Sequence, residues 1–313
     1  MCMNVAGQIM PYTPDVRFCE LFINDEYRGL YLAMETVARG EGRVDIRPYD
    51  DGKDISSYLL QVNWFSNSSN NIKPFTIYTK MMGPSIATSI EYPSENITFG
   101  LQEYIEQQIS DYEKALYSFD YDSQTYGYRS FLDVNSFVDY AIINEFFQNY
   151  DAGDLSTFFY KDLGGKLHIG PVWDFNNSLD NFPDILPDFG VVHSVRYNML
   201  IKDEYFVQKL IKRYRALRET VLSEAYLLNY IDETVAFLGP AVGRNFEVWD
   251  GTFDYEIMQS EIRIEHEWRN PGSYEESVDF LKEYIRKRGS WLDEHIDTLR
   301  QFCHESATKK YNH

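Results

Sequence analysis

The chain has 313 residues, and 44% of them are hydrophobic, which is enough to bury a core in one large domain or in two lobes. Its formal net charge of −20 argues against general nucleic-acid binding, because phosphate contacts need clustered Lys and Arg. The three cysteines lack metal-ligand spacing, so they support neither a disulfide scaffold nor a zinc site. We expect no membrane span, because there is no apolar run of about 18 residues. No signal peptide is visible in residues 1–11.

The first 95 residues have the pattern of a β-rich part. Residues 17–23 alternate and are rich in large apolar groups, a turn is expected at Asn24-Asp25, and residues 27–35 continue as a second strand. Further strands are predicted over residues 58–62 and 75–80. From residue 96 onward the apolar spacing becomes helical, over residues 101–119, 136–149, 204–222, 224–238 and 274–300. The sequence therefore predicts an α+β protein with parts 1–95 and 96–313.

The segment from residue 136 to 181 combines a helix, a loop and a hairpin. Asp133 or Asn135 can cap the helix, in which the polar Glu145 and Asn149 lie on an otherwise apolar stripe. We expect both side chains to support the following loop through hydrogen bonds. Two short strands, 157–160 and 167–171, flank a turn at residues 162–165.

This hairpin would bring two aspartates to its open end. A turn centred on Leu163-Gly164 makes paired positions sum to about 327, which places Gly153 opposite Asp174 and Asp151 nearby. Two neighbouring carboxylates repel each other unless a cation, a proton or a basic group intervenes. Magnesium held by carboxylates and substrate phosphates would satisfy that requirement.

Three motifs in this order resemble the CotH spore-coat kinase family: residues 149–153 (NYDAG), 160–167 (YKDLGGKL) and 170–175 (GPVWDF). The strand pair at residues 20–32, with Glu35 after it, is similar to the family's strand pair. The helix at residues 281–292 is similar to its C-terminal helix. The resemblance implies a divergent protein-kinase-like two-lobe fold. It would have a small β-rich N-terminal lobe, expected to be truncated, and a larger, mainly helical C-terminal lobe that carries the catalytic hairpin 149–181.

The same resemblance implies an activity and a set of site residues. Family members transfer the γ-phosphate of ATP to serine in partner proteins, with Mg or Mn as the metal. Asp151 corresponds to the catalytic Asp that orients the acceptor hydroxyl, and Asp174 to the metal-binding Asp of the Trp-Asp element. Ser156 and Asn176 take the further metal-ligand positions. The implied partner is a protein substrate, basic and Ser-rich, at a bacterial spore coat or cell surface.

Several positions depart from the family pattern. Ser156 stands where kinases carry a metal-binding Asn, Asn176 where relatives have Asp, and Glu91 where a base is common. The family's Lys-containing segment before the strand pair has no counterpart here. Lys80 is then the local candidate for a phosphate contact. Glu35 is expected to pair with a phosphate-binding lysine or to lie at the nucleotide cleft.

Two other functions stay open on this evidence. The departures from the pattern suit a CotH-type assembly protein of the spore coat or cell surface that has lost catalysis. Paired carboxylates and abundant aromatics would also suit a glycoside hydrolase. The order of the three motifs favours the kinase-like interpretation.

Overall fold

The computed structural model describes residues 1–73, 85–180, 188–254, 256–257 and 271–306. It combines α-helices with two small sheets, so the predicted α+β class is confirmed. The strands are β1 Val16–Ile23, β2 Glu26–Met34, β3 Tyr58–Trp64, β4 Asn71–Ile72, β5 Ile86–Tyr92, β6 Thr157–Lys161 and β7 Leu167–Ile169. The helices are α1 Cys2–Ala6, α3 Phe99–Tyr117, α4 Val134–Phe146, α5 Tyr197–Leu200, α6 Glu204–Arg218, α7 Glu224–Leu238, α8 Pro240–Val248 and α10 Tyr274–His295.

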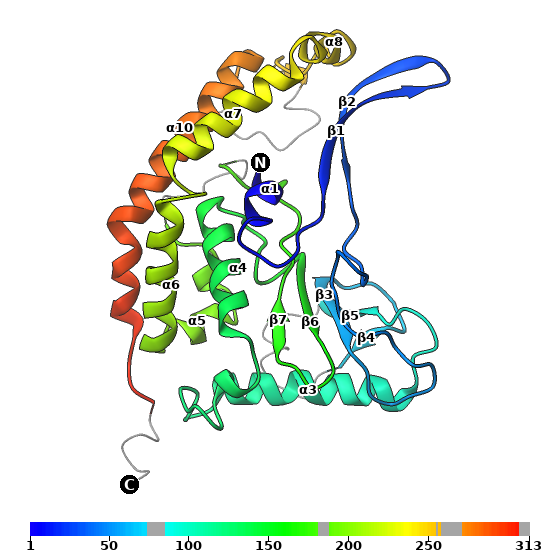
Figure 1. The fold of residues 1–313 in the computed structure, drawn as a ribbon, viewed down its shortest axis with the longest axis vertical. Coiled ribbons are helices and arrows are strands. Elements are labelled where there is room, and N and C mark those ends of the chain that lie inside the picture. The colour runs from blue at the N-terminus through cyan, green and yellow to red at the C-terminus, as the bar shows by residue number, and fades with distance from the viewer. Residues whose placement is uncertain (74–84, 181–187, 255, 258–270, 307–313) are drawn as a thin grey trace.

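A five-stranded sheet in the order β4-β5-β3-β6-β7 lies to the right of α4 and above α3 in the view of Figure 1. Its neighbouring strands are antiparallel, and β3 pairs directly with β6, Leu60 opposite Phe159. Strands from both sides of residue 95 therefore share one sheet. The division of the chain at that residue stays a prediction.

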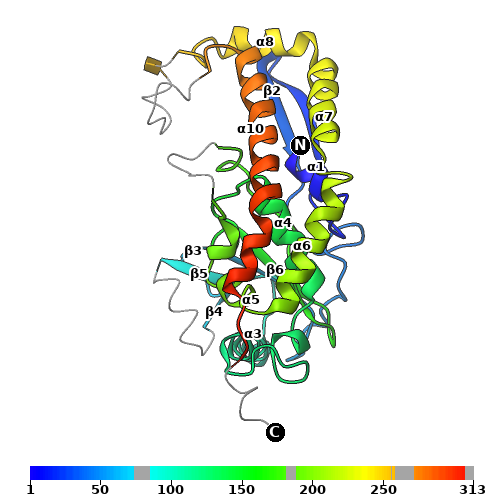
Figure 2. The ribbon, with the colours of Figure 1, turned by 90° about the vertical axis from the view of Figure 1, so that its left-hand side faces the viewer.

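Helix α4 packs beside this sheet and next to α6, while α10 runs along the outside of the helical layer (Figure 2). Helix α4 begins where Asp133 accepts a hydrogen bond from the Ser136 backbone N–H at 2.8 Å, and Asp133 is one of the two caps that the sequence predicts. Aromatic side chains fill the space between the elements, among them Phe137 of α4, Phe159 of β6 and Tyr197 of α5. Burial of these large rings stabilises the packing of α4 and α5 against the sheet.

Strands β1 and β2 form a separate ribbon that projects from the body and meets α8 near its middle (Figure 1). Asn245 of α8 accepts a hydrogen bond from the Leu30 backbone N–H at 2.9 Å. Gly29 has φ 110°, and a Cβ there would lie 2.6 Å from Nε1 of Trp249. Only glycine permits this close approach, so Gly29 is required for α8 to dock on the ribbon.

Most of the predicted elements are confirmed. The ribbon, β3, α3, α4, α6, α7 and α10 lie where the sequence pattern places them, with ends shifted by a few residues. Strands β4 and β5 and helices α1, α5 and α8 were not predicted. The strand expected over residues 75–80 lies outside the described residues.

The predicted register of the hairpin formed by β6 and β7 is wrong by one residue. Phe159 pairs with Ile169 and Tyr160 with His168, so paired positions sum to 328 rather than 327. The pairing also ends near Ile169, so it does not continue to place Gly153 opposite Asp174. The 162–166 connection sets this register, because Gly164 takes a positive φ of 78° there and the distant residues Ser57 and Arg47 hold Asp162 by hydrogen bonds.

That connection is anchored by Asp162, which gives a pH-dependent prediction. Partial burial raises its pKa. Hydrogen bonds from Ser57 Oγ (2.7 Å) and from the backbone and side chain of Arg47 oppose this and lower the pKa to about 2. A carboxyl with a depressed folded-state pKa contributes stability above its unfolded pKa of roughly 3.9, and this is lost as the pH falls toward the folded value.

We expect Asp162→Asn to cost about 1 kcal/mol of unfolding free energy at pH 7, a figure discounted for solvent screening because the side chain is 40% exposed. The difference from wild type should shrink between about pH 5 and pH 2. Urea unfolding at a series of pH values measures it. A difference that does not change with pH would contradict the assignment.

Candidate functional site

Asp174 lies on the loop that follows β7, and its backbone takes an uncommon positive φ of 56°. Its carboxylate Oδ2 accepts a hydrogen bond from Ser156 Oγ at 3.1 Å. Ser156 also has a positive φ, 47°, and directly precedes β6. Non-glycine residues seldom adopt the left-handed conformation, and those that do cluster at functional sites. Two such residues in contact therefore mark these loops as a candidate site.

Asp151 lies on the loop between α4 and β6, and is tied to the Asp174 loop by Asn177. Asn177 Nδ2 donates to Asp151 Oδ2 at 2.9 Å, while the Asn177 backbone oxygen accepts a hydrogen bond from the Tyr150 N–H at 3.4 Å. The two loops therefore interlock through Asn177 as well as through Ser156. The sequence did not predict a role for Asn177, because its hydrogen-bond partner Asp151 is 26 residues away along the chain.

Asn149 makes a third connection between the loops. It is 3% exposed, and its side-chain Nδ2 donates to the Trp173 carbonyl at 3.2 Å and to Asn144 Oδ1 at 3.1 Å. Asn149, two residues before Asp151, thus holds Trp173, the residue before Asp174. The sequence predicted that the Asn149 side chain supports the Asp151 loop, whereas its hydrogen bonds are with Asn144 of α4 and with the loop that carries Asp174.

Arg196 holds the Asp151 loop from its other side. This buried side chain donates to the Gly153 carbonyl at 3.2 Å, lies 3.8 Å from the Glu113 carboxylate of α3, and stacks over the ring of Phe159. A Cβ on Gly153, which has φ 95°, would lie 2.7 Å from Ser194 Oγ. The sequence offered no local signal for Arg196, because its partners are distant along the chain.

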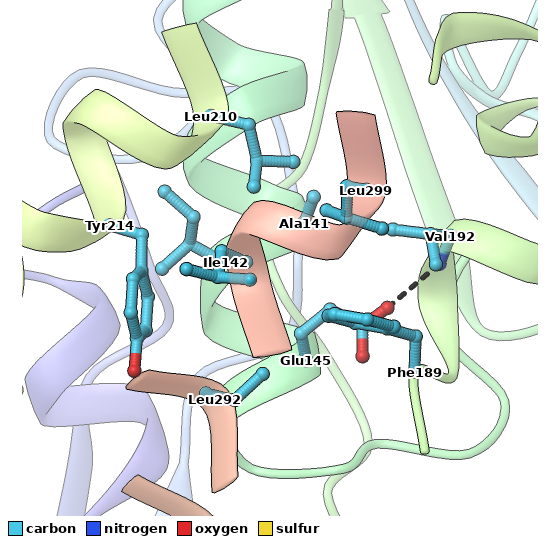
Figure 3. Close-up of a pocket in the computed structure, with 10 residues that line it drawn as sticks. Ala141, Ile142, Glu145, Phe189, Val192, Leu210, Tyr214, Leu292 and Leu299 are labelled. Atoms are coloured by element: carbon cyan, nitrogen blue, oxygen red, sulfur yellow. Dashed lines mark hydrogen bonds between the residues drawn. The ribbon is translucent and has the colours of Figure 1, made fainter. Parts of the chain in front are cut away.

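Glu145 has a different role from the one expected, because it contacts a segment other than the Asp151 loop. Its carboxylate accepts hydrogen bonds from the backbone N–H groups of Gly190 and Val192, both at 2.8 Å, and lies 3.3 Å from Arg288 of α10. Figure 3 shows this carboxylate pointing to Val192, beside an apolar cavity of about 10 Å³. Burial raises the pKa of Glu145, while Arg288 and the two N–H groups oppose that shift. Glu145 joins α4 to α10.

Of the remaining predicted site residues, the structure describes Glu35 and Asn176. Glu35 lies just past β2, where it accepts from the Asp15 backbone N–H at 3.1 Å and pairs with Arg43 at 3.3 Å; these contacts lower its pKa. Its partner in the structure is therefore an arginine rather than a lysine. Asn176 is exposed on the Asp174 loop. Lys80 lies outside the described residues.

The oxygen groups at this site suit a hard cation. Asp174 offers a carboxylate and Ser156 a hydroxyl in contact with it, and Asn176 on the same loop carries an amide carbonyl; magnesium takes such oxygen ligands together with water and substrate phosphates. Within the described ranges, no group of three or more His, Cys, Asp or Glu side chains is placed to hold a metal ion. The residues present fit a metal that arrives with a phosphate ligand.

A sequence model described as CotH kinase protein matches residues 1–292, which include the ribbon, both loops and most of α10. The chain belongs to the CotH family. Membership in this family supports a kinase-like function. A search of curated proteins finds no match for the chain. None of the described helices is long and apolar enough to cross a membrane.

Proposed function

We propose that this CotH-family chain transfers the γ-phosphate of ATP to Ser or Thr of a partner protein, on a divergent protein-kinase-like two-lobe fold. The observation that supports this best is the contact of Ser156 Oγ with Asp174 Oδ2, 3.1 Å apart. In the kinase arrangement, the residue five positions after the catalytic Asp and the metal-binding Asp serve neighbouring metal sites. Here the corresponding residues touch.

Asp174, Ser156 and Asn176 would hold Mg²⁺ or Mn²⁺ together with the nucleotide phosphates. The bound metal supplies positive charge that neutralises the β- and γ-phosphate oxygens. The chain's own contribution is to hold the Asp174 carboxylate in one orientation, through Ser156 at its side chain and Asn149 at the preceding carbonyl. Such preorganised ligands need no rearrangement at the moment of reaction.

Asp151 would orient the acceptor hydroxyl and take its proton at Oδ1. Its other oxygen, Oδ2, is engaged by Asn177 Nδ2 at 2.9 Å, which leaves Oδ1 to receive the hydroxyl. Arg196 fixes the loop two residues further on, at the Gly153 carbonyl. These contacts restrict Asp151 to one position relative to Asp174.

The expected partner is a basic, Ser-containing segment of a coat or surface protein. The chain's net charge of −20 attracts such a segment and speeds its encounter. Ionic strength should therefore affect the Michaelis constant for a basic peptide more than the turnover number.

Thermal unfolding with ATP and Mg²⁺ or Mn²⁺ tests the proposal. A ligand that binds only the folded state at 100 times its Kd adds about 2.7 kcal/mol to stability, so the Tm should rise when nucleotide and metal are both present. AMP with the same metal is the control, because it lacks the β- and γ-phosphates. Phosphate transfer from ATP to a basic Ser-containing peptide should accompany the shift. If ATP raises the Tm with neither metal, the chain is not a phosphotransferase, and an assembly role is the better description.

A further inference from the structure

Helix α4 carries a buried asparagine, Asn144, two residues before the helix ends at Phe146. Its side chain is 0% exposed, and the neighbouring residues 141–143 and 146 are buried and apolar. Asparagine is a weak helix former, and burying its amide costs free energy unless the amide is hydrogen-bonded. An apolar residue would therefore suit this position better, unless the amide has a specific task.

Both ends of the Asn144 amide are used. Its Nδ2 donates to the Tyr140 carbonyl one turn earlier in α4 at 2.9 Å, and its Oδ1 accepts from Asn149 Nδ2 at 3.1 Å. The Asn149 backbone N–H also donates to the Asn144 carbonyl at 2.9 Å. Asn144 therefore holds Asn149 through its side chain and through its backbone.

Asn149 extends this connection to the loop that carries Asp174. Its Nδ2 donates to Asn144 and also to the Trp173 carbonyl at 3.2 Å, while its Oδ1 is buried without a hydrogen-bond partner among the described residues. If the amide were reversed, Oδ1 would face two acceptors, Asn144 Oδ1 and the Trp173 carbonyl. A buried acceptor thus stays unpaired while both donors are used. Asn144 and Asn149 form an amide relay from α4 to the residue before Asp174.

The end of the amide relay restrains the backbone of Asp174. The peptide unit that joins Trp173 to Asp174 is planar, so holding the Trp173 carbonyl also restrains the Asp174 nitrogen. Asp174 has the uncommon φ of 56°, and its carboxylate is held separately by Ser156 Oγ. The amide relay and Ser156 therefore hold Asp174 at two different points.

We propose that Asn144 is a positioning residue for the metal, because it fixes the Asn149 amide that holds the peptide before Asp174. The inference rests on the proposed function, since it concerns the metal that Asp174 would bind. Residues behind the ligands of a metal set the orientation of those ligands, and loss of one weakens metal binding or activity by about 10–100-fold. Mg²⁺ demands near-ideal octahedral geometry, whereas Ca²⁺ accepts flexible geometry. A loosened Asp174 should therefore weaken Mg²⁺ binding more than Ca²⁺ binding.

Thermal unfolding of the full chain with saturating ATP, titrated with Mg²⁺ or Ca²⁺, measures the metal requirement. The Mg²⁺ concentration that gives half of the Tm increase should rise about tenfold in Asn144→Leu and in Asn144→Ser. The Ca²⁺ concentration should rise less, so the preference for Mg²⁺ should narrow. Both variants lack the amide: leucine keeps a similar volume, and serine tests the prediction with a small polar side chain if the leucine variant does not fold.

Ile143→Ala is the matched control, because Ile143 is also 0% exposed on α4 and its side chain makes no hydrogen bonds. It should lower the Tm of the free chain and leave the Mg²⁺ requirement unchanged. Asn149→Leu combined with Asn144→Leu should need the same Mg²⁺ concentration as Asn149→Leu alone, because both side chains act through one contact with Trp173. Additive effects would show that Asn144 acts by another route and would overturn the inference.

Hydrogen exchange of the metal-free chain gives a readout that needs no ligand. Peptides over residues 172–180 should exchange faster in Asn144→Leu than in wild type or Ile143→Ala, because their loop is held less firmly. If both Asn144 variants keep the wild-type Mg²⁺ requirement and exchange rate, the inference is overturned and the phosphotransferase proposal stands. If ATP with Mg²⁺ or Mn²⁺ does not raise the Tm of wild type, the proposed function and this inference are both overturned.

Discussion

Asp174→Asn is expected to abolish measurable phosphate transfer while the protein stays folded. The amide keeps an oxygen that can accept from Ser156 Oγ, so the 3.1 Å contact can persist, but it removes the negative charge that would hold the metal. Loss of a single preorganised group that stabilises transition-state charge costs about 10²–10³ in turnover. We therefore expect kcat to fall at least about 100-fold, as measured with a basic Ser-containing peptide.

Asp25→Asn is a matched control for this substitution. Asp25 is exposed at the ribbon turn and has φ 65°, close to the 56° of Asp174, so both changes place an asparagine in a left-handed conformation. The Tm of both variants should resemble that of wild type, and only Asp174→Asn should lose the Tm increase caused by ATP with Mg²⁺. If Asp174→Asn transfers phosphate at the wild-type rate, Asp174 is not the residue that holds the metal.

Arg288→Ala is expected to have the largest effect on stability. Arg288 is 4% exposed and donates to the Glu145 carbonyl from Nε (3.1 Å) and Nη2 (2.9 Å), and to the Asp188 carbonyl from Nη1 (2.9 Å). Its removal leaves the buried Glu145 carboxylate without a countercharge. Breaking one side of a buried ion pair costs about 3–5 kcal/mol. Chemical denaturation followed by far-UV circular dichroism measures the loss.

Arg286→Ala on the same helix is the control. Arg286 is 45% exposed, and its partners Glu224 and Glu283 lie at 3.6 and 3.8 Å, so its removal should cost less than about 1 kcal/mol. The double variant Glu145→Gln with Arg288→Met should recover part of the loss, because no unpaired buried charge remains. If Arg288→Ala and Arg286→Ala lower the free energy of unfolding equally, the buried Glu145 carboxylate does not need the Arg288 charge, and the prediction is wrong.

The sequence predicted those elements whose ends are set by neighbouring residues, such as helix caps and turn residues. Helix α7 occupies the range that its helical apolar spacing predicted, and in the structure Ser223 caps its first turn while Gly239-Pro240 follows its last. The ribbon was predicted because Asn24 and Asp25 both accept positive φ, 51° and 65°, between alternating strands. In each case the residues that decide the structure are close together in the chain.

Local signals failed where a distant partner decides. Strand β5 gains its stability by pairing with β3, and α8 by docking on the ribbon at Gly29, and neither contact is visible in a short window of sequence. The hairpin register differed by one residue because it depends on the conformation of the 162–166 connection, which hydrogen bonds from Ser57 and Arg47 help to set.

For the candidate site, the sequence by itself determined which residues to consider: Asp151, Ser156 and Asp174, from their order and spacing in motifs similar to those of the CotH family. Only the tertiary structure decided how they meet. The contacts arise from two loops interlocked by Asn149, Ser156 and Asn177 rather than from the ladder of a hairpin. It also decided that Glu35 pairs with Arg43 and that Glu145 pairs with Arg288. The physical reason is that side-chain hydrogen bonds and ion pairs act over a few ångströms in space, whatever the separation along the chain.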